Sequence, residues 1–173
     1  IGVLGSLDAD IRESTIANTT IGVGALTSGF VQPSGAQTAN GPMGGASVTV
    51  TNVTVTDSET GIVFDGSSTV LSGNAILGTG TSTGIELRGG MQVRAASTSP
   101  GSEVAVLDND LRNHDTGLAV RAGGGANYRI HFNDIRDNDV GVEVNTSSGW
   151  RVPVTFNDIV NNDVGIETND GDL

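Results

Sequence analysis

The chain has 173 residues and contains neither cysteine nor lysine. Without cysteine it has no disulfide and no thiolate metal site. No apolar run reaches the roughly 18 residues that a membrane-spanning helix needs, so we expect no membrane insertion. No signal peptide is visible. These absences exclude disulfide scaffolds, zinc fingers and helical membrane proteins.

Basic residues are scarce, because all eight are arginine and stand against 20 Asp and Glu residues, for a net charge of −12. A surface of this kind repels itself at low ionic strength and is screened by salt. Nucleic acids and anionic membranes attract basic patches, so we expect neither as a partner. Abundant Asp without Lys is typical of a halophilic archaeon or its virus. An acidic protein from an ordinary source is the alternative.

The residues from position 104 onward repeat with a fixed period. Asn109, Asn133 and Asn157 are 24 residues apart, and each precedes an Asp. A glycine follows eight residues after each Asn and opens a short segment in which apolar residues alternate. The same frame extends backward less regularly, which gives five clear turns and one weak turn. A fixed period of this length predicts a solenoid in which each repeat is stabilised by its neighbours.

The repeats favour strands over helices. Apolar positions alternate with period 2 and hold Val, Ile, Thr and Phe, which suit a pleated surface. The 26 glycines and the frequent asparagines suit tight turns and interrupt helices. One repeat has room for three short strands and three corners, with successive turns about 4.8 Å apart.

Units such as Asn133-Asp134-Ile135 and Asn162-Asp163-Val164-Gly165-Ile166-Glu167 resemble the right-handed parallel β-helix of the pectin-lyase-like superfamily. The resemblance covers most of residues 48–169 and implies an all-β, single-stranded solenoid of about six turns with about 24 residues each. That superfamily includes polysaccharide lyases, hydrolases, epimerases, virus tailspikes, adhesins and other surface proteins. The resemblance therefore predicts a fold and not an activity.

We expect one domain over residues 1–173, with insertions at 26–46 and 88–103. The abrupt start at Ile1 and the end at Leu173 favour a processed protein or a piece of a larger one.

The repeat frame also predicts the core. We expect Asn109, Asn133 and Asn157 to form a ladder of side-chain amides, because Asn bonds nearby backbone in turns. Phe132 and Phe156 are predicted to point inward, so that replacing either by Ala costs about 3–5 kcal/mol. Asp108 shares their register, so either it turns outward or its turn is distorted. The predicted apolar columns are Val106, Ile130 and Val154; Leu111, Ile135 and Ile159; and Leu118, Val142 and Ile166.

Acidic residues form columns in the same frame. Asp110, Asp134 and Asp158 are candidate ligands for Ca²⁺ or another hard cation, because such ions prefer carboxylate oxygens. The alternative is a solvated acidic face that Arg112 and Arg136 partly neutralise, and no cofactor is required for either reading. The other two columns are Asp115, Asp139 and Asp163, and Glu86, Glu143 and Glu167.

Four insertions follow the strand after the repeat glycine and should gather at one corner of the solenoid: 26–46, 88–103, 121–128 and 145–152. In repeat proteins such a loop face is commonly the binding face. Exposed aromatic residues stack on sugars or anchor protein partners. Trp150 and Tyr128 could instead fold back and cap the core. The candidate binding residues are Trp150, Arg151, Tyr128, Met91 and Arg94.

The sequence therefore predicts an extracellular structural or adhesive β-helix of a cell envelope or virion that binds a glycan or surface protein. A homo-oligomer or a larger assembly is compatible with this interpretation. A polysaccharide lyase or hydrolase, or a fragment of one, is the alternative. Enzymes of the superfamily act on sugar chains with carboxylates, sometimes with calcium and an Arg or His. The two histidines are His114 in a turn and His131 facing outward, and no motif assigns a catalytic residue.

Overall fold

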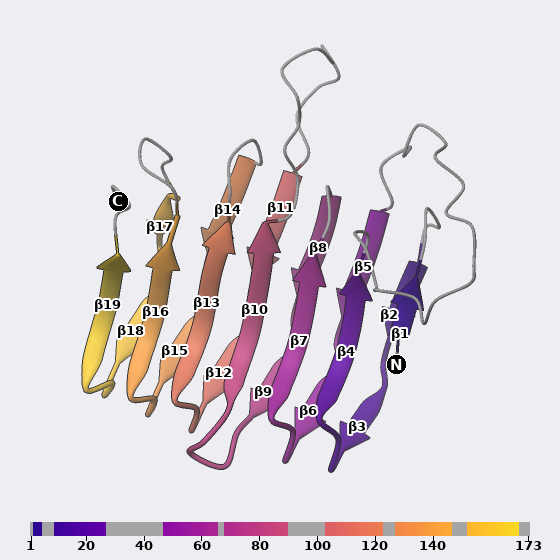
Figure 1. Ribbon diagram of the computed structural model, residues 1–173, viewed down its shortest axis with the longest axis horizontal. Coiled ribbons are helices and arrows are strands. Elements are labelled where there is room, and N and C mark those ends of the chain that lie inside the picture. The colour runs from indigo at the N-terminus through magenta and orange to yellow at the C-terminus, as the bar shows by residue number, and fades with distance from the viewer. Residues whose placement is uncertain are drawn as a thin grey trace, which may run out of the picture.

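A computed structural model describes residues 2–4, 9–26, 47–65, 68–89, 103–122, 127–146 and 152–169. Throughout these residues the chain forms strands and turns without helices, and the strands pair in three parallel sheets (Figure 1). Among the described residues there is accordingly no helix that could cross a membrane. The all-β parallel solenoid expected from the repeat period is confirmed.

The sheets contain seven, six and six strands. Sheet A comprises β1 (Gly2–Leu4), β4 (Ile21–Leu26), β7 (Thr60–Asp65), β10 (Thr83–Gly89), β13 (Thr116–Ala122), β16 (Val140–Asn145) and β19 (Val164–Asn169). Sheet B comprises β2 (Ala9–Arg12), β5 (Ser47–Thr51), β8 (Ser68–Ser72), β11 (Glu103–Leu107), β14 (Asn127–His131) and β17 (Val154–Thr155). Sheet C comprises β3 (Thr15–Ala17), β6 (Thr54–Thr56), β9 (Ala75–Leu77), β12 (Asp110–Arg112), β15 (Asp134–Arg136) and β18 (Asp158–Val160).

Each turn runs from sheet B to sheet C and then to sheet A, which defines three corners. The B–C corner always has two residues, and the C–A corner has three except at Gly78–Ser82, where it has five. The connections from sheet A to sheet B, at the A–B corner, differ most in length. The shortest has two residues (66–67) and the longest has twenty (27–46). The prediction that the four insertions leave from one corner is confirmed, but each begins later than predicted, because β4, β10, β13 and β16 extend to Leu26, Gly89, Ala122 and Asn145.

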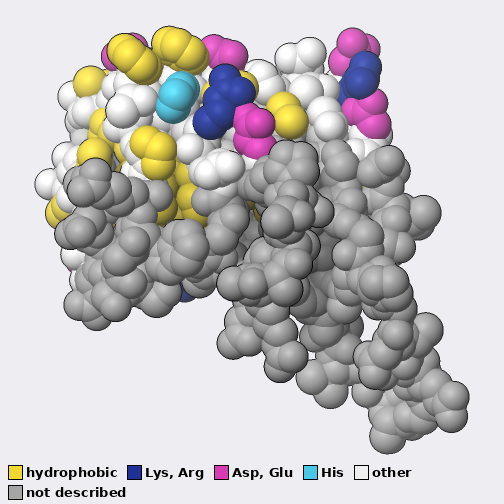
Figure 2. Space-filling view, turned by 90° about the horizontal axis from the view of Figure 1, so that it is seen from above, with side chains coloured by type: hydrophobic (Ala, Val, Ile, Leu, Met, Phe, Trp, Pro, Cys, Tyr) yellow, Lys and Arg dark blue, Asp and Glu magenta, His cyan; other side chains and the backbone are white. Residues whose placement is uncertain are grey.

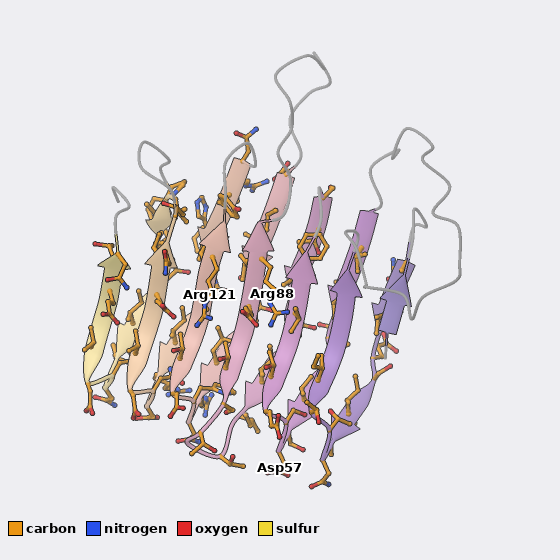
Figure 3. The ribbon with its side chains drawn as sticks, viewed as in Figure 1. Asp57, Arg88 and Arg121 are labelled. Atoms are coloured by element: carbon orange, nitrogen blue, oxygen red, sulfur yellow. The ribbon has the colours of Figure 1, made fainter. Side chains whose placement is uncertain are left out.

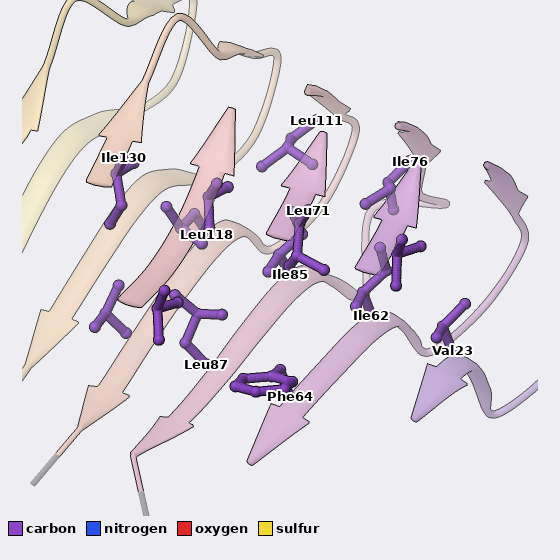
Figure 4. Packing of buried hydrophobic residues seen from close by; sticks show 14 of the residues in the cluster. Val23, Ile62, Phe64, Leu71, Ile76, Ile85, Leu87, Leu111, Leu118 and Ile130 are labelled. Atoms are coloured by element: carbon purple, nitrogen blue, oxygen red, sulfur yellow. The ribbon is translucent and has the colours of Figure 1, made fainter. Parts of the chain in front are cut away.

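The apolar columns predicted from the frame are confirmed by the strand register. Ile130 pairs with Val106 and Val154, and Val142 pairs with Leu118 and Ile166. The column through Leu111, Ile135 and Ile159 is equally continuous. Members in the middle turns are fully buried, as Figure 4 shows for much of the core. Ile166 lies in the last strand of sheet A and is 38% exposed, because no described turn covers it.

The prediction that Phe132 and Phe156 point inward is wrong. Their side chains are 60% and 75% exposed, and their φ values are 60° and 57°. Both occupy the first position of the B–C corner, where Asp108 also has a positive φ of 54° and faces solvent. A residue in this left-handed conformation interrupts the strand alternation, so the side chain that would point inward points outward. The predicted loss of 3–5 kcal/mol for Phe132→Ala therefore does not apply.

Asparagine fills the inward position at the B–C corner, and the predicted Asn ladder is confirmed. The Asn109 Nδ2 donates to Asn133 Oδ1 at 2.9 Å, and the Asn133 Nδ2 donates to Asn157 Oδ1 at 2.8 Å. The ladder extends one turn further than predicted, because Asn74 Nδ2 donates to Asn109 Oδ1 at 2.9 Å. Each acceptor amide oxygen also takes the backbone N–H of the preceding turn. The ladder thus satisfies buried polar groups that a tight corner would leave unpaired.

A second, shorter ladder lies at the C–A corner and was not predicted. Asn138 Nδ2 donates to Asn162 Oδ1 at 2.9 Å, and Asn138 Oδ1 accepts the backbone N–H of His114 at 3.0 Å. Glycine follows at each repeat because the backbone of sheet A approaches closely there. A Cβ on Gly117 would lie 2.8 Å from Gly141 O and 2.9 Å from an Ile135 methyl group.

Candidate functional site

The largest group of ion-paired side chains in the described residues lies on the outer face of sheet A, near the A–B corner (Figure 3). Glu86 and Arg88 lie two residues apart on β10 and therefore project from the same face. Strand register places Arg88 beside Arg121 on β13. Glu143 on β16 completes the group, which we call the Arg–Glu cluster: Glu86, Arg88, Arg121 and Glu143.

Ion pairs connect the cluster across three strands. Arg88 Nη2 lies 2.7 Å from Glu86 Oε2, and Arg121 Nη1 lies 3.8 Å from Glu86 Oε1. Arg121 Nη2 lies 3.2 Å from Glu143 Oε2. Between the two carboxylates, the register position on β13 is held by Ala119, and Arg121 reaches both neighbouring strands. Two arginines and two glutamates thus balance in charge within an otherwise acidic protein.

Burial differs between the two kinds of side chain. The Glu86 side chain is only 9% exposed, whereas the side chains of Arg88 and Arg121 are each 50% exposed. A carboxylate so far from water is stable only when it is paired and hydrogen-bonded. The Arg121 side chain combines its ion pairs with half of its surface exposed, and a planar guanidinium suits carboxylates and sugar hydroxyls.

The sequence indicated only part of this cluster. The column of Glu86, Glu143 and Glu167 is confirmed, with Ala119 between the first two. The partnership with Arg88 and Arg121 was missed, although both arginines lie two residues after positions of that column. Residues two positions apart on a strand share a face, so comparing each position of the acidic column with the residue two positions later would have revealed these ion pairs.

The acidic column of Asp110, Asp134 and Asp158 is also aligned as predicted. Arg112 forms an ion pair with Asp110 on its own strand, and Arg136 Nη2 lies 2.8 Å from Asp134 Oδ2. The partial neutralisation expected of these arginines is thus present. No group of three or more His, Asp or Glu side chains in the described residues is arranged to hold a metal ion. Cation binding by the column stays a prediction.

A family model described as "Right handed beta helix region" matches residues 1–164. The chain belongs to the right-handed β-helix family. Comparison with curated proteins and with solved structures gave no match. The handedness and the architecture of about six turns agree with the prediction from the repeats.

Of the five predicted binding residues of this β-helix, only Tyr128 lies within the described residues. Trp150, Arg151, Met91 and Arg94 lie outside them. Tyr128 is the first residue of β14 on the face that points inward. It is half-buried and packs against the core. Burial raises the pKa of its phenol to about 12. For Tyr128 the alternative reading as a cap on the core is therefore the better description.

The two histidines have opposite environments. His131 is partly exposed on the outer face of sheet B, as expected, and contacts the rings of Phe132 and Phe156. His114 lies in the turn at the C–A corner, as expected, and its side chain is buried there, with only 2% exposed. Its Nε2 lies 3.0 Å from Ile76 O, and its Nδ1 lies 2.8 Å from Ser82 Oγ. Because a carbonyl only accepts, Nε2 carries the proton and Nδ1 accepts from the Ser82 hydroxyl.

Burial lowers the pKa of His114, although the bond to Ile76 O and the charge of Asp115 oppose this shift. The pKa of His114 in the folded protein then lies below the unfolded value of about 6.5. The contribution of the neutral imidazole to stability is therefore complete above pH 6.5 and is lost as the pH falls below this value. We expect the free energy of unfolding to decrease below pH 6.5 with a limiting slope of about 1.4 kcal/mol per pH unit from this group. Denaturant titrations between pH 8 and 5 measure it.

His114→Asn should remove this slope, because an amide side chain does not titrate. Asn fits this position because it can extend the ladder that already contains Asn138. His131→Asn is the matched control and should keep the slope. An identical pH dependence of wild type and His114→Asn would contradict the assignment of a buried neutral imidazole.

Proposed function

We propose that this β-helix is a structural or adhesive protein of a cell envelope or virion, which presents its A–B corner and the adjoining Arg–Glu cluster to a glycan or a surface protein. The observation that carries the proposal is that connections at the A–B corner range from two to twenty residues, whereas the B–C corner always has two and the C–A corner has three or five. Near-constant turns at the other two corners preserve the strand register, and variation at the A–B corner changes recognition without changing the core. A pectin-lyase-like relationship and a halophilic source belong to the same proposal.

The acidic composition supports an environment with high salt. Repulsion within a net charge of −12 is screened as ionic strength rises. We expect the melting midpoint to rise markedly between millimolar and molar NaCl, measured by circular dichroism at constant pH. A midpoint that stays constant or falls over this range would contradict the halophilic origin.

A polysaccharide hydrolase is the second candidate, and one observation favours it. Glu86 and Glu143 lie two strands apart on the same face, which corresponds to a backbone separation of about 9.6 Å. Carboxylates at about 6.5–9.5 Å serve inverting glycosidases as general acid and base. Both carboxylates are already engaged in ion pairs with Arg121, however.

One binding experiment separates the two functions. Wild type, Arg121→Ala and the double variant Glu86→Gln/Glu143→Gln are incubated with neutral and acidic polysaccharides, and bound protein and released reducing ends or unsaturated products are measured. We expect binding without product, weakened by Arg121→Ala. Product release that disappears in the Glu→Gln double variant would establish the hydrolase or lyase instead.

A further inference from the structure

The B–C corner carries exposed aromatic side chains in its last two turns. We call His131, Phe132 and Phe156 the aromatic corner. In the four preceding turns the same corner position holds Glu13, Asn52, Gly73 and Asp108, all with positive φ. Polar residues and glycine adopt this conformation readily, whereas Phe rarely does. Two successive phenylalanines at such a position are therefore unfavourable for folding, and they contribute nothing to the core.

The rings are arranged as a surface. Phe132 and Phe156 stack with their centroids 5.7 Å apart and an interplanar angle of 18°. The His131 ring meets both at about a right angle, with centroid distances of 6.0 Å to each. In Figure 2 hydrophobic side chains, a histidine and basic and acidic side chains gather along one margin of the molecule. The described residues thus expose an organised aromatic site on a protein with 3% aromatic residues.

Polar groups border the aromatic corner on the outer face of sheet B. Arg129 lies two residues before His131 on β14 and projects from the same face. Its Nη1 lies 2.7 Å from Glu103 Oε1, and both side chains are about half exposed. Thr155 lies in register beside His131 and is exposed. The surface therefore combines stacked rings with an ion pair and a hydroxyl group.

We infer that the aromatic corner and the Arg129–Glu103 pair form a binding site for a neutral glycan. The C–H faces of a sugar ring match the apolar aromatic rings, and sugar hydroxyls match the donors and acceptors of Arg129, Glu103 and Thr155. The ion pair leaves no net positive charge to attract an acidic sugar, and the net charge of −12 repels one. The same charge disfavours a second copy of this chain as the occupant.

This inference rests on the proposed binding function but assigns it a site away from the A–B corner and the Arg–Glu cluster. The aromatic corner lies at the opposite end of the sheet B strands from the A–B corner. The two locations can therefore be inactivated independently.

The test uses Phe132→Asn/Phe156→Asn, because Asn suits the positive φ at this corner, as Asn52 illustrates. Affinity electrophoresis in gels that contain a neutral polysaccharide (mannan, amylose or β-glucan) or an acidic one (alginate or polygalacturonate) measures binding. We expect wild type to be retarded by at least one neutral polysaccharide, and the double variant to lose affinity at least tenfold without a lower melting temperature. Val160→Asn, another exposed apolar position in the last turn, is the matched control and should bind as wild type does.

Several results would overturn the inference: retardation by acidic polysaccharides alone, neutral binding that survives in the double variant, or no neutral binding by wild type. Self-association that ultracentrifugation detects in wild type and not in the double variant would identify a second copy as the occupant. If neutral binding survives in the double variant but is lost in Arg121→Ala, the proposed function stands and the aromatic site falls. If neither glycans nor surface proteins bind, both the proposed binding function and the aromatic site are wrong.

Discussion

Replacing Asn133 by Ala is expected to lower the free energy of unfolding by about 3 kcal/mol or more. The two protons of its amide nitrogen are shared among Val106 O, His131 O and Asn157 Oδ1, and its oxygen accepts from the backbone and side-chain nitrogens of Asn109. Each buried group left without a partner costs about 1–3 kcal/mol. Urea titration followed by circular dichroism measures the change.

Two further variants show whether the hydrogen bonds or the side-chain volume matter. Asn133→Asp keeps the shape but removes the donors and adds a buried charge, so it should destabilise at least as much as Ala. Asn127→Ala changes an exposed asparagine on β14 and should stay within about 0.5 kcal/mol of wild type. A loss below about 1 kcal/mol for Asn133→Ala would mean that the ladder does not hold the B–C corner.

Replacing Phe64 by Ala should cost about 3–5 kcal/mol, as for large buried aromatic residues. Phe64 projects inward from β7, is 2% exposed and pairs in register with Leu87 on β10. Phe132→Ala and Phe156→Ala should each change stability by less than about 1 kcal/mol, because their rings are exposed. The same urea titrations compare all three variants. If Phe64→Ala and Phe132→Ala lowered the free energy of unfolding equally, Phe132 would have to be buried, which would contradict the structure.

Much of the fold follows from the repeat because stacked turns leave little freedom of register. Once Asn109, Asn133 and Asn157 are aligned, every other position of those turns is aligned with them, and the core columns and acidic columns result. Early turns were harder to read because their corner residues vary. Val53 and Ser14 occupy the inward corner position where later turns have Asn.

The errors have a common physical origin at the corners. Strand alternation predicts side-chain direction only while φ and ψ stay extended, and one left-handed residue reverses it. Phe132 and Phe156 were placed inward because the repeat frame continues the alternation of the preceding strand, whereas their positive φ at the corner decides their direction. His114 lies in a turn as expected, but its burial was not foreseen, because it takes the inward place that Asn138 and Asn162 hold in the following turns. Corner residues also create the aromatic corner, which composition alone would not suggest.

Engineered cysteine pairs test the stacked β-helix most directly, because the chain has no cysteine of its own. Asp134 and Asp158 are register partners on adjacent strands, and Asp110 lies one strand further from Asp158. Disulfides form when Cα atoms lie within about 4.4–6.8 Å, which fits one strand spacing of about 4.8 Å and excludes two. We expect Asp134→Cys/Asp158→Cys to form an intramolecular disulfide under mild oxidation, detected by peptide mass mapping, and Asp110→Cys/Asp158→Cys to remain reduced. Cross-linking of the second pair, or of neither pair in the folded protein, would contradict the 24-residue stacking on which the account depends.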